Sequence, residues 1–286
     1  NYKKFMDLLN RIGFMQGRLS PKINNLIQAF PIDNWRQEFV EANSIGMKLM
    51  EWTLDYKDIY LNPIMHEQGR DEIIELSKKH KISIPSLTGD CFMQMPFWKE
   101  SNVDKITLKK IFIDVLKAAS KLGIQHVVIP IVDNGKLESK AQEELLLSFL
   151  LENIQLIKSL SLNILFESDL DPINLQKFIE QFPQESFGIN YDIGNSASLG
   201  YDPKKEFEYF GHYVRNVHVK DRKFKGDTVF LGRGDANFKL VYENLKKISY
   251  KGNFILQTAR AENNDHKSVL EEFRDMTFDL LSRNFI

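Results

Sequence analysis

The sequence predicts a single (β/α)₈ barrel of the α/β class over residues 1–286. Short apolar runs rich in Ile, Val and Phe alternate with longer amphipathic stretches, which is typical of βα units around a parallel sheet. Eight such units fit in 286 residues, and no linker rich in Pro, Gly or Ser divides them. The alternative is an open doubly wound sheet. The lack of a G-x-G-x-x-G turn after the first strand weakens its dinucleotide-binding form.

The expected elements follow one another in regular order. Strands are predicted at 11–16, 48–53, 82–88, 125–132, 162–167, 187–192, 214–219 and 253–257. Helices are predicted near 33–44, 68–79, 103–122, 138–160, 171–182, from 202 onward, 238–248 and 265–281. Asp33 is placed to cap the first of these helices. Asp171-Pro172 and Asp202-Pro203 are expected to open two others, because proline is favoured at the first helical position.

Composition narrows the classes of function and location. Lys plus Arg number 38 and Asp plus Glu 39, which argues against a broad surface for nucleic acid or anionic lipid. The one cysteine, Cys91, excludes an intrachain disulfide and suits a reducing cytoplasm, the expected location. No apolar run approaches the ~20 residues of a membrane span, and no signal peptide is evident. We therefore expect neither a nucleic-acid nor a membrane partner.

Three successive predicted strands end in a side chain that can bind a metal. They present Glu167, Asp192 and His218 at the carboxyl ends of strands, where barrel active sites lie. Burying such charges without partners is costly, and a divalent cation is one partner that satisfies all three. The alternatives are solvated strand ends and, for His218, a hydrogen-bonded core histidine. These ligand types suit Mn²⁺, Co²⁺, Zn²⁺ or Mg²⁺.

Two motifs carry a resemblance to a known family. Tyr191-Asp-Ile-Gly-Asn195 and Val217-His-Val-Lys-Asp221 resemble the sugar phosphate isomerase/epimerase family of xylose isomerase-like TIM barrels. Phe230-Leu-Gly-Arg-Gly-Asp235 and Phe254-Ile-Leu-Gln257 fit the same pattern, so that the resemblance covers nearly the whole chain in strand order. Within the family, the chain is most similar to pentulose- and hexulose-phosphate 3-epimerases, such as the L-ribulose-5-phosphate 3-epimerases.

The resemblance implies a metal-dependent isomerase or epimerase of a sugar, keto-sugar or sugar phosphate. The family binds one divalent metal through Glu, Asp, His and Glu of its last four strands, which correspond here to Glu167, Asp192, His218 and Gln257. In its epimerases the two glutamates move protons on opposite faces of an enediolate, while the metal polarises the carbonyl group. Gln257 can offer a metal its carbonyl oxygen, but it cannot take a proton.

Gln257 leaves several mechanisms open at its catalytic position. Glu167 can act alone on one face, as in an aldose–ketose isomerase. Alternatively, Glu51, Asp90 or Asp221 supplies the second acid/base group. A lyase or dehydratase on the same site, or a catalytically degenerate sugar-binding barrel, are the alternative functions.

Basic side chains near strand ends are candidate substrate-binding groups, because barrels often hold phosphate or carboxylate groups there. The candidates are Arg18, Lys220, Arg222, Arg233 and Arg260, of which Arg18 and Arg260 follow a strand end within three residues. The alternative for each is a solvated surface charge. Glu51 and Asp90 are added as substrate contacts. The expected partner is a small carbohydrate, and the family's tendency to pair leaves a homodimer open.

Other side chains receive expectations of a structural kind. Asp235 is expected to cap the helix near 238–248, and Asn195 to shape the turn after the sixth strand. An aromatic group is expected either to cover a sugar ring or to pack in the core: Trp52, Phe92, Phe97 and Trp98. The remaining histidines are expected in surface loops and helices: His66, His80, His126, His212 and His266.

Overall fold

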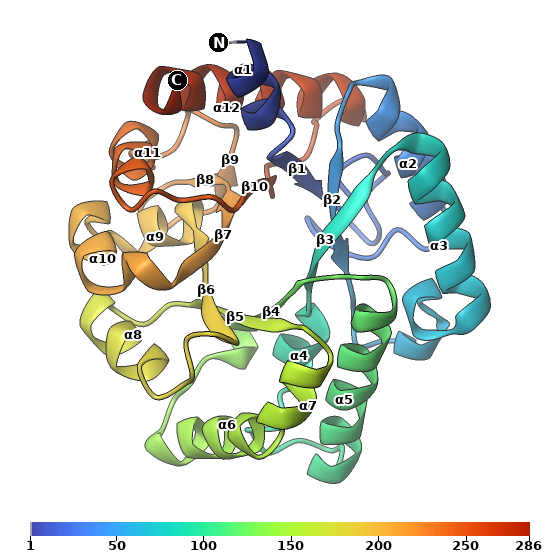
Figure 1. Ribbon diagram of the computed structural model, residues 1–286, viewed down its shortest axis with the longest axis vertical. Coiled ribbons are helices and arrows are strands. Elements are labelled where there is room, and N and C mark those ends of the chain that lie inside the picture. The colour runs from blue at the N-terminus through green and yellow to red at the C-terminus, as the bar shows by residue number, and fades with distance from the viewer. Residues whose placement is uncertain (1) are drawn as a thin grey trace.

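The computed structural model describes residues 2–286 and contains a closed barrel of eight parallel strands within a ring of helices (Figure 1). Around the barrel the strands run in the order β1-β10-β7-β6-β5-β4-β3-β2. The barrel strands are β1 Ile12–Met15, β2 Leu49–Thr53, β3 Ser83–Thr88, β4 His126–Ile131, β5 Asn163–Ser168, β6 Phe187–Asp192, β7 Val214–Val219 and β10 Asn253–Leu256. The predicted (β/α)₈ fold class is confirmed.

Twelve α-helices occur in residues 2–286, and the largest of them alternate with the strands. They are α1 Tyr2–Leu9, α2 Trp35–Ser44, α3 Glu67–His80, α4 Asp90–Gln94, α5 Lys105–Lys121, α6 Lys140–Glu152, α7 Ile154–Ser159, α8 Pro172–Ile179, α9 Ile193–Leu199, α10 Pro203–Phe210, α11 Phe238–Lys247 and α12 His266–Phe285. Short 3₁₀ turns lie at Ile59–Leu61, Pro63–Met65, Asp133–Gly135 and Gly211–Tyr213. No helix in this part of the chain is long and apolar enough to cross a membrane.

The strands are buried on both sides, which explains their nearly continuous apolar sequences. Every residue of β6 is buried, and so are the four residues of β1. The inner faces fill the barrel, while the outer faces pack on helices such as α5, whose apolar stripe includes Phe112 and Leu116. This packing leaves the carboxyl ends of the strands as the place where polar side chains meet.

The two helices expected to open at Asp-Pro begin at Pro172 and Pro203, and the aspartate before each proline caps its helix. The Asp171 carboxylate accepts the N–H groups of Ile173 and Asn174, and Asp202 accepts that of Lys204. The expectation for Asp33 is wrong, because α2 begins at Trp35 after a residue that makes no side-chain cap.

The physical reason is a backbone turn before α2. The carbonyl oxygen of Pro31 accepts the N–H groups of Asn34 and Trp35 at 2.9 and 2.8 Å, so the first turn needs no side-chain acceptor.

The helix predicted over 138–160 is divided at Asn153. This residue separates α6 from α7, and its Nδ2 donates to the carbonyl oxygen of Phe149 at 2.8 Å. A short amide side chain competes with the backbone for helix carbonyl groups, which disturbs the helix locally. The apolar spacing alone does not reveal this interruption.

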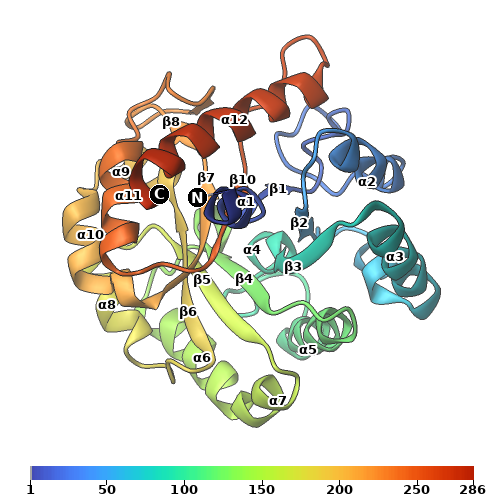
Figure 2. The same ribbon diagram turned by 45° about the horizontal axis from the view of Figure 1, so that its top comes forward.

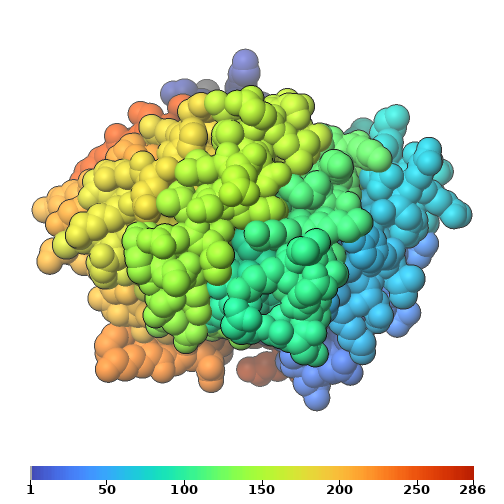
Figure 3. All heavy atoms as spheres, turned by 90° about the horizontal axis from the view of Figure 1, so that it is seen from below, coloured from blue at the N-terminus to red at the C-terminus, as the bar shows by residue number. Residues whose placement is uncertain are grey.

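Long loops gather at the carboxyl end of the barrel. The loop after β7 contains a small antiparallel hairpin, β8 Asp221–Arg222 with β9 Thr228–Val229, within the segment predicted as a long loop. Figure 3 shows this orange segment and the blue segment after β1 projecting at the same end of the molecule, with the dark blue N-terminal helix at the opposite end. Figure 2 shows α1 lying beside α12, and the two helices are in contact.

Candidate metal centre at the carboxyl end of the barrel

Glu167, Asp192 and His218 converge at the ends of three adjacent strands. They lie on β5, β6 and β7, and the register pairs Asp192 directly with His218. Nδ1 of His218 is 3.0 Å from Oε2 of Glu167 and 3.9 Å from Oδ2 of Asp192. All three side chains are buried, and one ligand atom from each lies within 4.8 Å of the others. The arrangement forms a possible metal site.

The other ring nitrogen of His218 faces Glu51 of β2, across the barrel. Nε2 lies 2.6 Å from Oε1 of Glu51, and both side chains are fully buried. Donating this N–H to a carboxylate leaves Nδ1 for a metal, which is the usual setting of a metal-binding histidine. The predicted contact of Glu51 with substrate does not follow from this position, because His218 stands over it.

Glu51 is in turn held by three further donors. Oγ of Ser86 lies 2.6 Å from Oε2, Nδ2 of Asn216 donates to the same oxygen at 2.9 Å, and the Thr88 hydroxyl donates to Oε1. Burial raises the pKa of Glu51, but the charge and hydrogen bond of His218 and the two hydroxyls outweigh it and lower the pKa to about 2. Glu51 is therefore an ionised anchor for the imidazole.

The same charges act on His218. Burial lowers the pKa of this histidine, but the negative charges of Glu51 and Glu167, whose carboxylates lie 2.6 and 3.0 Å from the ring nitrogens, outweigh burial and raise the pKa to about 10. A site with this much negative charge around one imidazole favours a cation, whether a proton or a metal ion. A metal ion binds the deprotonated Nδ1 and so takes the place of the proton.

Two asparagine amides fix the carboxylate of Glu167. Nδ2 of Asn190 donates to Oε2 at 2.9 Å, and Nδ2 of Asn195 donates to Oε1 at 3.1 Å. Asn195 lies inside α9 and its side chain reaches the site, whereas the sequence suggested only a turn residue. Its own oxygen accepts from Nη1 of Arg222 at 2.9 Å. Arg222, expected to bind substrate, thus supports Glu167 from behind.

The two carboxylate oxygens of Asp192 have different roles: one caps a helix and the other lies in the candidate metal site. Oδ1 accepts the backbone N–H of Asn195 at 2.8 Å and so caps α9. Oδ2 lies 2.9 Å from Nζ of Lys220. Lys220, a predicted substrate-binding residue, therefore neutralises one carboxylate of the site in the absence of other cations.

Gln257 follows β10 and faces the loop after β1. Its Nε2 lies 2.5 Å from Oε1 of Gln28, and the amide of Gln28 donates to Asp90. Oε1 of Gln257 is buried and has no hydrogen-bond partner among the described residues. A free, buried carbonyl oxygen is the donor that a fourth ligand position requires.

The donor set fits a divalent cation. Two carboxylates, an imidazole nitrogen and an amide oxygen are ligands of Mn²⁺, Co²⁺, Zn²⁺ and Mg²⁺. Nδ1 of His218 and Oε1 of Gln257 are both buried without hydrogen-bond partners within residues 2–286. Polar atoms without partners also occur elsewhere in the core, so the indication of a metal rests on His218 Nδ1, which lies together with the oxygens of Glu167 and Asp192.

Arg18 and Arg260 stabilise the loop after β1 through hydrogen bonds to its backbone. Nε of Arg18 donates to the carbonyl oxygen of Thr258 at 2.8 Å and Nη1 to that of Ile27 at 2.9 Å, while Arg260 donates to the carbonyl oxygen of Ser20. Both guanidinium groups are nearly inaccessible. Burial, together with the charge of Arg260, lowers the pKa of Arg18 to about 9. The two predicted substrate-binding residues mainly hold this loop against the end of β10.

Two further candidates lie in the loop after β7. The carboxylate of Asp221 accepts the backbone N–H groups of Gly232, Gly234 and Ala236 at 2.9, 2.8 and 3.2 Å. Three backbone bonds make Asp221 a loop anchor and leave it a poor acid/base group. Arg233 is exposed, and its guanidinium carbon lies 5.2 Å from the centre of the Phe230 ring.

Some structural expectations are wrong. His126 begins strand β4 and is partly buried, and His266 is buried at the start of α12. Asn237, rather than Asp235, caps α11, because Asp235 instead accepts the N–H of Phe224. Of the two roles expected for the aromatic group, packing in the core is the one observed, and all four residues are buried there: Trp52, Phe92, Phe97 and Trp98.

The sequence reasoning missed the amide and hydroxyl groups that hold the carboxylates. Asn190 and Asn216 each lie two residues before a predicted ligand, Asp192 and His218, and side chains alternate along a strand, so each pair shares the inner face. That spacing could have identified them. Ser86 and Thr88 have the same two-residue spacing. Gln28 lies in a loop, and no pattern in the sequence points to it.

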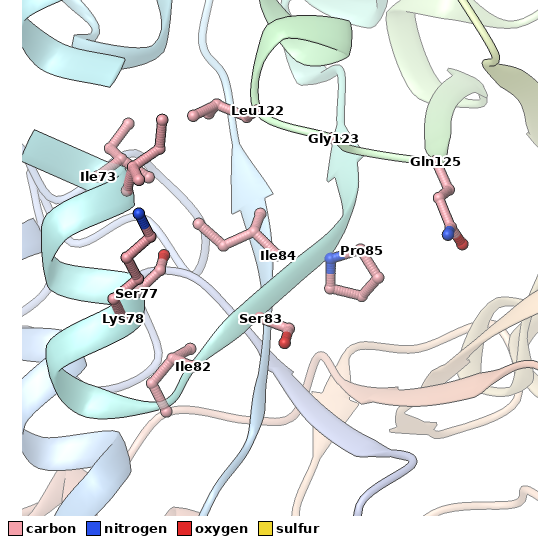
Figure 4. Close-up of a pocket in the computed structure, with 11 residues that line it drawn as sticks. Ile73, Ser77, Lys78, Ile82, Ser83, Ile84, Pro85, Leu122, Gly123 and Gln125 are labelled. Atoms are coloured by element: carbon pink, nitrogen blue, oxygen red, sulfur yellow. The ribbon is translucent and has the colours of Figure 1, made fainter. Parts of the chain in front are cut away.

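A separate cavity lies at the opposite end of the barrel. It has a volume of about 450 Å³ and is bounded by α3, the start of β3 and the segment before β4 (Figure 4). Ile73, Ile84 and Leu122 give it an apolar wall. It contains none of the predicted site residues.

Comparison with known proteins agrees with this geometry. Residues 39–276 match the family model described as xylose isomerase-like TIM barrel. The L-ribulose-5-phosphate 3-epimerase UlaE of Escherichia coli O1:K1 / APEC is 22% identical over 254 residues, 84% of this chain and 88% of UlaE. D-psicose 3-epimerase with D-tagatose from Clostridium cellulolyticum H10 superposes with a TM-score of 0.70 at 13% identity, over 95% of this chain and 99% of that one. A xylose isomerase-like TIM barrel protein from Mycobacterium smegmatis in complex with magnesium superposes with a TM-score of 0.70 at 15% identity, over 96% of this chain and 97% of that one. The chain belongs to the family of xylose isomerase-like TIM barrels.

Proposed function

We propose that this protein is a metal-dependent isomerase or epimerase that moves a proton on the carbon beside the carbonyl group of a sugar, keto-sugar or sugar phosphate. The observation that carries the proposal is the convergence of Glu167, Asp192 and His218, with the second nitrogen of the histidine already bound to Glu51. Family membership supports the same class of reaction, since relatives such as UlaE are named as sugar-phosphate epimerases.

Glu167, Asp192 and His218 are the residues that would hold the metal, and Oε1 of Gln257 is available as a fourth donor. When bound, a divalent cation polarises the substrate carbonyl group and so acidifies the neighbouring C–H bond. Nζ of Lys220 lies 2.9 Å from Oδ2 of Asp192, beside this site, where the lysine would also meet an anionic or hydroxyl group of the substrate.

Glu167 is the base in this proposal. Its two oxygens accept hydrogen bonds from Asn190 and Asn195, which fixes the plane of the carboxylate at the mouth of the barrel. The carboxylate removes the proton next to the carbonyl group and leaves an enediolate. Proton return to the same carbon on the opposite face gives an epimer, whereas return to the neighbouring carbon gives an isomer.

The substrates of the relatives suggest the first compounds to test. L-ribulose 5-phosphate is the substrate in the name of UlaE, and D-tagatose is bound in the Clostridium structure. Both have a ketone next to a C–H bond that carries a hydroxyl group. We extend this substrate class, a keto-sugar with or without phosphate, to the present chain.

Hydrogen exchange with solvent tests the proposal. Purified protein with added Mn²⁺ is incubated in D₂O with L-ribulose 5-phosphate, D-tagatose and D-psicose, and deuterium uptake is followed by NMR and mass spectrometry. We expect uptake at the carbon beside the carbonyl in the native protein and none in Glu167→Gln. Glu185→Gln, which changes an exposed carboxylate of comparable chemistry, should retain it. Exchange retained in Glu167→Gln, or a product lighter by one water, would contradict the proposal.

A further inference from the structure

We propose that Asp90 is the second acid/base group of this site and acts on the face of the substrate opposite to Glu167. The inference rests on the proposed function and deepens it. It assigns to the loop after β3 the proton transfer that Gln257 cannot perform.

The barrel topology places Asp90 across the mouth from the candidate metal ligands. Asp90 follows β3, and in the strand order of the closed barrel β3 lies opposite β7, which carries His218. The amide of Gln28 contacts both Gln257 and Asp90, so Asp90 lies one side chain away from the β10 position that Gln257 occupies. β3 is separated from β5, which carries Glu167, by β4 alone, so a substrate held over His218 would meet Glu167 from the β5 side and Asp90 from the loop after β3.

The other carboxylates considered for this role are occupied. Glu51 accepts from four side chains and lies behind His218. Asp221 accepts three backbone N–H groups and holds the hairpin loop. Asp90 is equally buried, at 6% exposure, yet the Gln28 amide is its one side-chain partner in residues 2–286. A buried carboxyl group with so few donors is better suited to exchange a proton than to anchor a loop.

The charges around Asp90 agree with this role. Burial raises the pKa of Asp90 to about 7, and the charges of Asp55 and Glu167 act in the same direction, against the Gln28 hydrogen bond and the charge of His218. An acid/base group is most effective when its pKa lies near the working pH, because both of its protonation states are then populated.

The proton balance of the step is closed. The Glu167 carboxylate takes the proton from the carbon beside the carbonyl group. The electron pair of the broken C–H bond then forms the enediolate. Protonated Asp90 then gives its proton to the opposite face of that carbon, which restores the carbonyl group and inverts the configuration. Glu167 is left protonated and Asp90 ionised, and proton exchange with water resets both groups.

The two faces can be distinguished by deuterium. Asp90→Asn is compared with Asp133→Asn, which changes an exposed carboxylate on the loop after the next strand, with L-ribulose 5-phosphate and D-tagatose as probes in D₂O with Mn²⁺. We expect Asp90→Asn to lose epimer formation by roughly 10²–10⁴-fold while still exchanging the substrate hydrogen with retained configuration. In Asp90→Asn/Gln257→Glu, which restores a carboxylate at the β10 position, we expect epimer formation to recover. Asp133→Asn should match the native protein.

Each other result overturns the inference in a recognisable way. Epimer formation at the native rate in Asp90→Asn overturns the role of Asp90 and leaves the proposed function intact. So does equal loss of exchange and epimer formation in a variant whose thermal unfolding matches that of Asp133→Asn. Isomer without epimer from the native protein also overturns it. Absence of any exchange by the native protein overturns the proposed function, and with it the second acid/base group.

Discussion

The two sides of the His218 ring differ in how their carboxylates are satisfied. On the Nε2 side, Glu51 accepts from Ser86, Thr88 and Asn216 as well as from the imidazole. On the Nδ1 side, Glu167 and Asp192 approach the ring, but Nδ1 itself has no hydrogen bond among the described residues. Both sides are buried and acidic. One is filled by protein donors, and the other is arranged for a ligand.

This difference distinguishes a carboxylate that positions the imidazole from one that can take part in the chemistry. A buried carboxylate with every lone pair occupied is held in one place and one charge state, and it serves to orient its neighbour. A buried carboxylate beside an unpartnered nitrogen retains the capacity to bind a cation or to take a proton. Residue type alone does not distinguish Glu51 from Glu167, whereas their hydrogen-bond partners do.

The largest effect is expected from Glu167→Gln. Loss of the base should reduce proton exchange on the keto-sugar probes by about 10²–10⁴-fold, the usual contribution of a general base. The fold should persist, because the substitution keeps the shape of the side chain and removes a buried charge, although the glutamine oxygen can accept from only one of Asn190 and Asn195. Deuterium uptake and the melting temperature measure the two effects separately. A large drop in melting temperature together with retained uptake would reverse the comparison and make Glu167 the structural partner.

Glu51→Gln should weaken metal binding without removing a ligand. Loss of the carboxylate behind a metal-binding histidine typically costs 10–100-fold in affinity. Titration calorimetry with Mn²⁺ measures this change.

The matched control for this variant is Glu38→Gln. Glu38 is equally buried, but it accepts the backbone N–H groups of Gly17 and Leu19, away from His218. We expect Glu38→Gln to lower stability and to leave Mn²⁺ affinity unchanged. Equal affinities for Glu51→Gln and the native protein would show that Glu51 does not orient the imidazole.

A second histidine, His126, is expected to make the stability of the protein depend on pH. Burial, followed by the positive charge of Arg215, lowers the pKa of His126 to about 4. Between pH 6.5 and 4 the unfolded chain therefore binds a proton that the folded chain does not, so stability falls on acidification through this window. The loss is on the order of 2 kcal/mol.

His126→Leu should remove this part of the acid destabilisation, as measured by urea unfolding between pH 7 and 4. His212→Gln, at an exposed position, is the control and should leave the pH profile unchanged. An unaltered profile in His126→Leu would mean that folding does not lower the pKa of this histidine.

The smallest effect is expected outside the site. Asp171 caps α8 through the N–H groups of Ile173 and Asn174. Asp171→Ala should cost about 1 kcal/mol of unfolding free energy. Mn²⁺ affinity should not change, since the cap contacts none of the candidate ligands. A change in Mn²⁺ affinity in Asp171→Ala would show that metal binding depends on general stability. The weaker binding expected of Glu51→Gln would then no longer point to its contact with His218.

Periodicity predicted the barrel because eight buried strands and their helices repeat a simple pattern. The positions of Glu167, Asp192 and His218 at strand ends then predicted that they lie together, since the barrel topology brings these ends together independently of the loop conformations. The hairpin after β7 and the division at Asn153 escaped prediction, because they depend on local hydrogen bonds rather than on apolar spacing.

The partners of the candidate ligands were harder to predict than the ligands. Glu51 was expected near substrate, yet it lies behind His218 through a contact between residues 167 positions apart. Arg18 and Arg260 were expected at an anion, yet they bind backbone carbonyl groups of the loop after β1. The sequence shows charge at a strand end, but which neighbour uses that charge depends on tertiary contacts.

The central claim is that a divalent metal ion binds at Glu167, Asp192 and His218, and the most direct test is the metal content of the purified protein. Mass spectrometry is applied to the native protein and to Glu167→Ala and His218→Ala, with Asp171→Ala as the control, before and after dialysis against Mn²⁺. We predict near-stoichiometric metal in the native protein and the control, and loss of it in both site variants. Native protein that holds no metal even after added Mn²⁺, or site variants that retain it, would contradict the claim.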